Sequence, residues 1–406
     1  MRNPGSLGPL PRKLEEELKS LARHPVPFEQ RDHTQCEAIT RAIQSVALCW
    51  PKLKSTKSWL NECARSTDAT VAIAALQELV RSWKDDPETL PLLKELARVG
   101  KPHWVRSAAL GELAQGWKDD PEILPMLKEV ARADKEFGAR KAALQELAKG
   151  WKHDPETLAM LKEIARSDKE WGFREIALRE LANAWKDDPE TLPILKVCAR
   201  TDESSEVRKT AVEQLALGWK NDPDTLPILK ERAQADKSES VRGATVLELA
   251  KVWKDDPDTL PVLKVCAGSD EDTYVRATAV HKVARGWRSN PSILPWLKER
   301  ARSDEDTNVR LTALQELAWG WKDDPDTLLI LKERAHSDED TNVRLVAVDE
   351  LARGWKSNPT ILSWLKDLAR SDEDPLVRAG VVQELARGWT DDPEVQSLSA
   401  EFGLKS

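Results

Sequence analysis

Apolar residues follow a helical spacing through most of the chain, and this spacing restarts every 34 residues. Leu90, Leu93 and Ala97 are separated by three and four positions, which places them on one face of a helix. A polar turn follows, and a second apolar face runs from Val105 to Trp117. Each unit therefore predicts two antiparallel helices, called helix A and helix B below.

The start of helix A and the end of helix B carry fixed residues. Asp86-Pro87 predicts the start of helix A, because the aspartate caps free amides and proline needs no amide donor in the first turn. A tryptophan ends helix B at a constant interval, and we interpret it as a packing residue at a fixed core position. These tryptophans are Trp83, Trp117, Trp151, Trp185, Trp219, Trp253, Trp287, Trp321, Trp355 and Trp389.

A buried arginine is predicted near the start of helix B. Arg106 falls among the apolar positions, and an arginine recurs there in nine consecutive units. A buried guanidinium needs a partner, and an aspartate recurs six residues before the arginine, so we predict a ladder of Asp–Arg pairs between layers. The arginines are Arg106, Arg140, Arg174, Arg208, Arg242, Arg276, Arg310, Arg344 and Arg378, and the aspartates are Asp134, Asp168, Asp202, Asp236, Asp270, Asp304, Asp338 and Asp372.

Antiparallel helix pairs with an aspartate in the turn and Val-Arg at the start of helix B resemble the HEAT repeat family, including its phycobilisome-lyase-like subgroup. The resemblance implies an all-α fold, a right-handed α–α superhelix with a 34-residue repeat. Tetratricopeptide repeats share this period, but their small-residue and tyrosine pattern is missing. The sequence Trp-Lys-Asp-Asp-Pro-Glu-Thr-Leu-Pro is also similar to the C-terminal arms of bacterial NACHT-type sensor proteins of the STAND class. Their phosphate-binding loop does not occur in this chain.

Four segments are predicted along the chain. Residues 1–30 form a flexible N-terminal arm, and residues 31–65 form degenerate capping helices, in which Leu53 replaces the proline that starts helix A. Residues 66–393 form the HEAT-like array. Residues 394–406 form a C-terminal capping half-repeat, where Gln396 and Ser399 stand in place of leucine, as expected for a terminal layer.

Composition disfavours some classes of partner and indicates the compartment in which the protein works. The net charge of −8, with 33% charged residues, disfavours a nucleic acid. The sequence lacks a run of 18 apolar residues and a signal-peptide h-region, so we expect a cytoplasmic protein with no membrane contact. Cys198 and Cys266 lie two repeats apart, roughly 20 Å at ~8–10 Å per layer, which is too far for a disulfide. We interpret them as small buried apolar residues.

Catalytic, cofactor and metal sites are not predicted. The six histidines are scattered over different units, without a spacing that would gather metal ligands on one face. We therefore expect a monomeric protein that is not an enzyme and uses no cofactor.

Specificity for a partner is expected at positions that vary between units. On helix B these positions lie one, five and nine residues after each ladder arginine. Large apolar residues there, on a face that should be wet, are typical of a contact site, although isolated surface hydrophobes are the alternative. We predict that a partner polypeptide binds in the concave groove with Trp319 as anchor. The predicted site comprises Leu311, Trp319, Leu345, Arg285, Arg353 and Arg387.

Three functions fit these features. The first is a non-enzymatic interaction scaffold, or ligand-sensing arm, whose partner is a protein or peptide. The second, implied by the lyase-like resemblance, is a phycobilin lyase or a chaperone-like relative. The third, implied by the NACHT resemblance, is a detached sensor arm that works with a separate NTPase.

Overall fold

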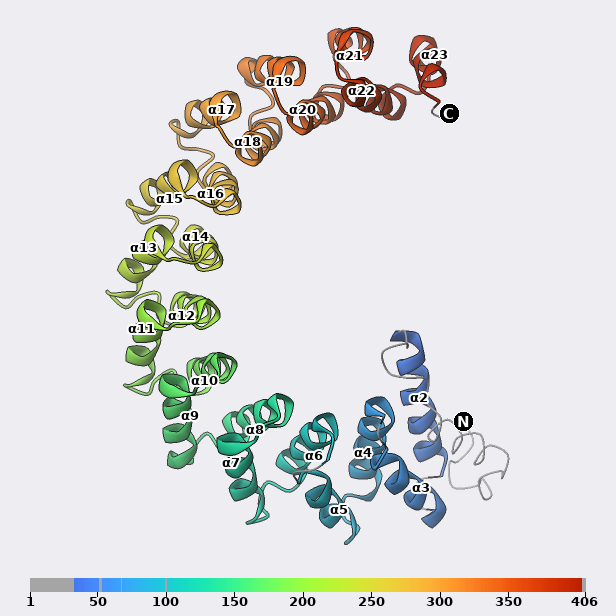
Figure 1. The fold of residues 1–406 in the computed structure, drawn as a ribbon, viewed down its shortest axis with the longest axis vertical. Helices are drawn as coiled ribbons and strands as arrows, with labels where there is room; N and C mark the ends of the chain where they lie inside the picture. Colours follow the sequence, from blue (N-terminus) through green and yellow to red (C-terminus); the bar gives the residue numbers. More distant parts are fainter. Residues whose placement is uncertain (1–32, 51–52, 67, 99–100, 404–406) are drawn as a thin grey trace. The chain divides into compact units, whose positions relative to one another are not determined.

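The computed structural model describes residues 33–50, 53–66, 68–98 and 101–403 (Figure 1). These residues form 22 helices and no strand, so the fold is all-α. The chain divides into two units, residues 1–194 and 195–406. Helix α11 (Thr191–Thr201) lies at the boundary, and each unit is described separately.

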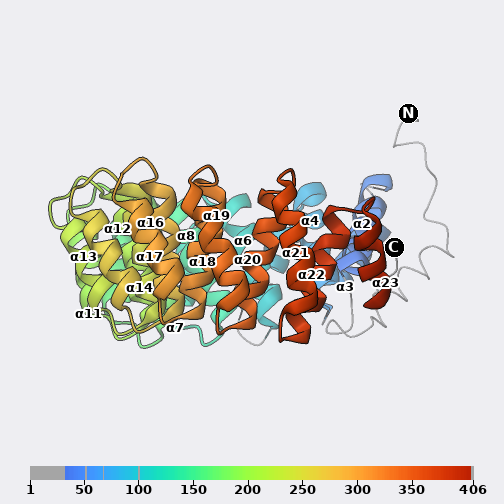
Figure 2. The same cartoon turned by 90° about the horizontal axis from the view of Figure 1, so that it is seen from above.

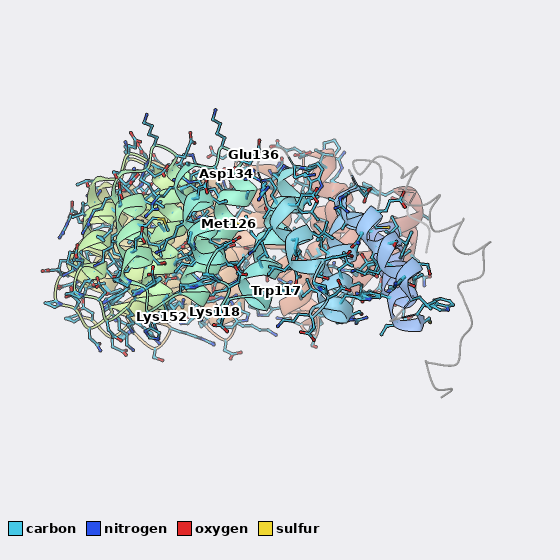
Figure 3. All side chains as sticks on the ribbon, turned by 90° about the horizontal axis from the view of Figure 1, so that it is seen from below. Trp117, Lys118, Met126, Asp134, Glu136 and Lys152 are labelled. Atoms are coloured by element: carbon cyan, nitrogen blue, oxygen red, sulfur yellow. The ribbon has the colours of Figure 1, made fainter. Side chains whose placement is uncertain are left out.

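Unit 1 consists of helix pairs stacked in a row. Within a pair, helix A packs against the following helix B, and each helix B packs against the next helix B. Figure 3 shows Asp134 and Glu136, from a turn between helices A and B, at one edge of the unit, and Trp117, Lys118 and Lys152 at the opposite edge. The helices A are α3 (Lys54–Ala64), α5 (Thr89–Leu96), α7 (Ile123–Ala133) and α9 (Pro155–Ser167). The helices B are α2 (His33–Cys49), α4 (Ala69–Trp83), α6 (His103–Gly116), α8 (Phe137–Gly150) and α10 (Trp171–Ala184).

Unit 2 repeats this arrangement, with the helices B forming its inner layer (Figure 1). Figure 2 shows α18, α20 and α22 side by side in chain order. The helices A are α13 (Thr225–Ala235), α15 (Thr259–Ser269), α17 (Ile293–Ser303), α19 (Pro325–Ser337), α21 (Pro359–Ser371) and α23 (Pro393–Glu401). The helices B are α12 (Ser205–Gly218), α14 (Glu239–Val252), α16 (Thr273–Gly286), α18 (Thr307–Gly320), α20 (Thr341–Gly354) and α22 (Pro375–Gly388).

The Asp-Pro motif starts helix A as predicted in some pairs and slightly later in others. In α9 the carboxylate of Asp154 accepts a hydrogen bond from the amide of Thr157 at 2.7 Å, with proline in the first turn. In α5 the amide of Thr89 donates to Asp86 O, three residues back, at 3.0 Å. This tight first turn delays the α-helical pattern by two residues.

The predicted Asp–Arg ladder is confirmed in most layers, where the arginine pairs with the aspartate of the next layer. Arg208 donates from Nε and Nη2 to the two carboxylate oxygens of Asp236 at 2.9 and 2.7 Å. Its Nη1 donates to the backbone oxygen of Asp202, in its own turn, at 2.9 Å. The same pairing over 28 residues joins Arg106 to Asp134 and Arg140 to Asp168 in unit 1, and Arg242 to Asp270 and Arg310 to Asp338 in unit 2. Arg344 lies 3.5 Å from Asp372 but donates its hydrogen bond to Asp374 at 3.2 Å.

The ladder changes register at Arg276. Its Nη2 donates to Asp306 at 2.7 Å, whereas the expected partner, Asp304, accepts a bond from Arg300 Nη1 at 2.9 Å. Arg300 lies four residues before Asp304, but Arg232 and Arg334 contact Asp236 and Asp338 from the same distance in sequence, and those aspartates keep their ladder arginines. The prediction that Arg276 pairs with a carboxylate six residues before the next ladder arginine was therefore wrong in its choice of residue.

The repeated tryptophans lie at the edge of each unit, which corrects the prediction of a core position. Trp185 is buried, and the other nine are half-buried. Trp117 follows the last residue of α6 and its amide caps the helix by donating to Leu113 O at 2.9 Å. The chain turns there, so the indole can be covered on one side only. A basic residue from the preceding repeat adds a cation–π contact: Lys84 Nζ lies 5.9 Å from the Trp117 ring centroid.

A second row of ion pairs, between helices A, was not anticipated from the sequence. Lys94 Nζ lies 2.9 Å from both Asp120 and Glu122, the acids that begin the next helix A. Where Asn or Ser replaces these acids, the lysine lies over a tryptophan instead, and Lys264 Nζ is 5.5 Å from the Trp296 ring centroid. The other lysines with carboxylate partners are Lys57, Lys128, Lys162, Lys196, Lys230, Lys298 and Lys366.

The ends of the array contain the expected kinds of element. Helices α2 and α3 fall within residues 31–65, and α23 is the last helix. The flexible arm predicted for residues 1–30 lies outside the described residues. The four-segment division itself stays a prediction.

Candidate interaction surface on the helix-B layer

Trp319 is one of the large exposed apolar residues of the helix-B layer of unit 2, together with Leu217, Tyr274 and Leu376. It lies near the end of α18, and 56% of its surface is exposed. The guanidinium carbon of Arg285, one layer back, lies 4.4 Å from the ring centroid, and that of Arg288 lies 5.4 Å from it. Cation–π contacts at these distances hold the indole in place. Its exposed part is therefore presented in a fixed orientation.

A buried carboxylate fixes Arg285 in turn. Glu316 Oε1 accepts a hydrogen bond from Arg285 Nε at 3.1 Å and lies 2.7 Å from His281 Nδ1. The Glu316 side chain is 5% exposed, whereas that of Arg285 is 48% exposed. The carboxylate thus lies beneath the guanidinium, and the cation faces solvent.

Arg353 and Arg387 occupy the same position in the next two layers. Arg353 pairs with Glu350, three residues earlier, and lies 3.8 Å from Asp349. Arg387 Nη2 pairs with Glu384 and donates to Asp349 at 2.7 Å. Both arginine side chains remain more than half exposed, at 63% and 64%. The structure therefore places Arg285, Trp319, Arg353 and Arg387 in one column, with one residue in each layer.

The two predicted leucines do not join Trp319 in an exposed cluster. Leu311 and Leu345 are both half-buried. A methyl group added at Gly380 would overlap Leu345 Cδ2, so Leu345 packs onto the backbone of α22. Leu311 lies eight residues before Trp319 on the same helix, about 12 Å along the axis. The sequence pattern showed the shared face but not that the next helix B covers these leucines.

The carboxylates beneath the column were missed in the sequence, although they recur with the repeat. A glutamate stands six residues after most ladder arginines, and burial raises the pKa of Glu350 and Glu384 in spite of the nearby arginines. The signal that could have revealed these carboxylates was the dipeptide Glu-Leu, which recurs in the middle of most helices B. The residues are Glu78, Glu112, Glu146 and Glu180 in unit 1 and Glu248, Glu316, Glu350 and Glu384 in unit 2.

Unit 1 has a groove that the sequence reasoning also missed. Its volume is about 890 Å³, and its apolar lining includes Phe137, Met160, Ile164 and Phe173. Phe137 stacks on Phe173 with ring centroids 5.1 Å apart. The available signal was the unusual turn Asp-Lys-Glu-aromatic-Gly, which occurs in two consecutive repeats, at residues 134–138 and 168–172.

The described part of the chain holds neither a metal-ligand cluster nor a membrane-spanning helix. Its histidine, cysteine, aspartate and glutamate side chains include no group of three that could hold a metal ion. In residues 33–403, apart from the gaps given above, no helix is both long and apolar enough to cross a membrane. Cys198 and Cys266 are buried and not joined in a disulfide, as predicted.

Stacked antiparallel pairs with a buried arginine ladder define an α-helical solenoid. Within that class, the chain belongs to the HEAT repeat family. The family model for HEAT repeats matches residues 101–182, 124–216, 158–250, 192–284, 261–352 and 328–400. A comparison with curated proteins gives no match.

Solved structures share the fold at low sequence identity. Kap95p, whose binding induces the switch loops of RanGDP to adopt the GTP-bound conformation, is 14% identical with a TM-score of 0.56, over 98% of this chain and 62% of that chain. Kap121p bound to Nup53p is 15% identical with a TM-score of 0.53, over 93% of this chain and 45% of that chain. YibA of Escherichia coli is 22% identical with a TM-score of 0.42, over 71% and 98% of the two chains. The chain thus spans less than two thirds of either karyopherin.

Proposed function

We propose that this protein is a non-enzymatic cytoplasmic scaffold that binds a partner polypeptide on the helix-B layer of unit 2. The observation that carries the proposal is Trp319, an exposed indole fixed by the guanidinium of Arg285 within a charged layer. Tryptophan and arginine are the residues most enriched at the energetic centres of protein interfaces. Because Trp319 is already held in place, less side-chain freedom is lost when a partner covers it.

The fold supports a protein partner. HEAT-repeat chains with a similar architecture have been solved with proteins bound, including Kap121p with Ste12p and with Nup53p. Their partners belong to those proteins, and the partner of this chain is a separate question. The net charge of −8 supports a polypeptide over a nucleic acid.

Replacing Trp319 by alanine is expected to weaken partner binding by about tenfold or more, as for an interface hot spot. The folding free energy should change by less than about 0.5 kcal/mol, because the side chain is exposed. The measurement is affinity capture of partners from a native lysate, identified by mass spectrometry, with the captured partner then titrated against each variant.

Leu329→Ala is the matched control, since Leu329 is 60% exposed but lies on α19, in the helix-A layer. This control should capture as much partner as the unsubstituted chain. Equal capture by Trp319→Ala, or a Trp319→Ala chain that does not fold, would overturn the proposal.

A second candidate is the chromophore lyase or chaperone-like function. The observation in its favour is the groove of unit 1, since about 890 Å³ lined by both apolar and charged side chains suits a small organic ligand. Coexpression with a bilin and its apoprotein, scored for coupled pigment, separates this function from a scaffold. The sensor-arm function instead requires a neighbouring gene that encodes a phosphate-binding loop.

A further inference from the structure

We infer that the partner segment of unit 2 is an extended acidic polypeptide with one large apolar residue in register with Trp319. This inference rests on the proposed function and specifies its ligand. It starts from one column of side chains on the helix-B layer, nine residues after each ladder arginine. In unit 2 the column begins with the exposed Leu217 and continues, from one layer to the next, with Lys251, Arg285, Trp319, Arg353 and Arg387.

Each cation of the column is paired with a carboxylate, and the cation is the more exposed partner of the pair. Lys251 pairs with Glu248 at 3.4 Å, with side-chain exposures of 69% and 18%. At each arginine of the column, too, the guanidinium side chain is more exposed than the glutamate with which it pairs. A partner approaching this face therefore meets the cations first. Asp349, which bridges Arg353 and Arg387, is the half-buried exception.

The arginines keep unused hydrogen-bond donors. The bonds from Arg285 to Glu316 both come from Nε, and those from Arg387 to Glu384 and Asp349 come from Nη2. Since a guanidinium has five N–H groups, donors remain for a carboxylate of the partner. Such charge-assisted bonds are stronger than neutral ones.

Trp319 selects against a ligand that is acidic throughout. Arg285 covers part of the indole. If the ligand were acidic throughout, its carboxylates would lie against the remaining exposed part of the ring. Burying a charged group against an apolar ring without a partner is unfavourable. A large apolar side chain at this one position removes that cost and gains buried apolar area.

Spacing sets the sequence pattern of the ligand. Neighbouring helices pack about 8–10 Å apart, and an extended chain rises about 3.3 Å per residue. One layer therefore corresponds to about three residues of the ligand. The pattern is acidic-x-x-apolar-x-x-acidic-x-x-acidic, with the apolar residue facing Trp319 and the acids facing Arg285, Arg353 and Arg387.

Synthetic peptides test this pattern on the full chain. A fluorescein-labelled peptide with glutamates and one leucine at this spacing, and serine and glycine elsewhere, is compared with a scrambled peptide of equal composition. Fluorescence anisotropy should show at least about tenfold tighter binding of the patterned peptide, the size of effect expected from an interface centre. The combined variant Arg353→Gln and Arg387→Gln should lose about as much affinity. Arg302→Gln, on the helix-A layer and 44% exposed, should lose none.

Thermal unfolding checks that each variant is folded, and Lys251→Gln gives a second, milder test at the edge of the column. Equal binding of both peptides, no binding of either, or tighter binding of a labelled oligothymidine would each overturn the inference. Should the captured partner depend on Trp319 and ignore Arg353→Gln with Arg387→Gln, the acidic ligand is wrong and the proposed scaffold function stands.

Discussion

Replacing Arg208 by alanine is expected to lower the free energy of unfolding by about 3–5 kcal/mol, the cost of leaving one charge of a buried pair unpaired. Arg208 and Asp236 are almost completely buried, and the guanidinium also serves the backbone oxygens of Asp202 and Glu203. The variant therefore removes the two shortest cationic donors to the buried carboxylate, which keeps the Ser238 amide at 2.9 Å and Arg232 at 3.4 Å, and leaves two backbone acceptors without their donor. Urea unfolding followed by circular dichroism measures the change.

Two comparisons make this result specific to the ladder. Arg200→Ala removes an exposed pair with Glu231, whose closest atoms are 3.9 Å apart, and should cost less than about 1 kcal/mol. The double variant Arg208→Met with Asp236→Leu should be more stable than Arg208→Ala, because it removes both charges together. A ladder without structural importance would give equal unfolding midpoints for Arg208→Ala and Arg200→Ala.

Acid is expected to unfold the protein through the carboxylates of the two ladders. Burial is the largest single effect and raises the pKa of Asp236. The hydrogen bonds from Arg208 and the Ser238 amide, together with the charges of Arg208 and Arg232, outweigh it, so the pKa lies below its usual value. The bond from Lys230 lowers the pKa of Asp256. An aspartate in the unfolded chain titrates near pH ~3.9. Their contribution to stability is therefore complete above about pH 4 and is lost as the pH falls through the lowered folded pKa.

The glutamates beneath the helix-B column have the opposite effect. Burial raises the pKa of Glu350 and Glu384 in the folded protein, so their ionised forms oppose folding. That opposition is relieved as the pH falls through their raised pKa. Aspartates with a lowered pKa, in the Asp–Arg ladder and in the row of lysine pairs between helices A, outnumber these glutamates. They therefore dominate the pH dependence of stability. They include Asp86, Asp120, Asp154, Asp222, Asp236, Asp256, Asp306, Asp326, Asp374 and Asp392.

The expected urea midpoint is therefore level, or slightly higher, from pH 7 to about pH 5, and falls steeply below about pH 4. Urea titrations at half-unit intervals measure it, with ionic strength held constant so that screening does not vary. A midpoint that stays constant down to pH 2.5 would show that the ladders do not hold the layers together.

Most of the fold could be predicted from the sequence, because the repeat shows each structural position many times. Each position is read about ten times, so the Asp-Pro helix start and the buried Arg208-type residue stand out from single-unit variation. The ladder could be predicted because a buried guanidinium requires a carboxylate. Its change of register at Arg276 could not, since Asp304 and Asp306 lie in one turn and the sequence does not show which of them accepts the bond.

The candidate site was only partly predictable. Trp319 could be predicted because a large apolar residue at an otherwise polar helix position is evident from the sequence alone. The covering of Leu345 by α22 depends on the missing side chain at Gly380, one layer away. The buried glutamates were overlooked because a polar residue on helix B was taken as solvated. Burial there depends on how closely neighbouring helices pack, which a single repeat does not encode.

The most direct test of the binding surface is site-specific photo-crosslinking in cells. A photoreactive amino acid placed at Gln315, an exposed position on α18 one turn before Trp319, is compared with the same amino acid at Leu329 on α19. The proposed function predicts that the partner forms an adduct from position 315 and not from position 329. An adduct from position 329 alone, or equal adducts from both positions, would contradict it.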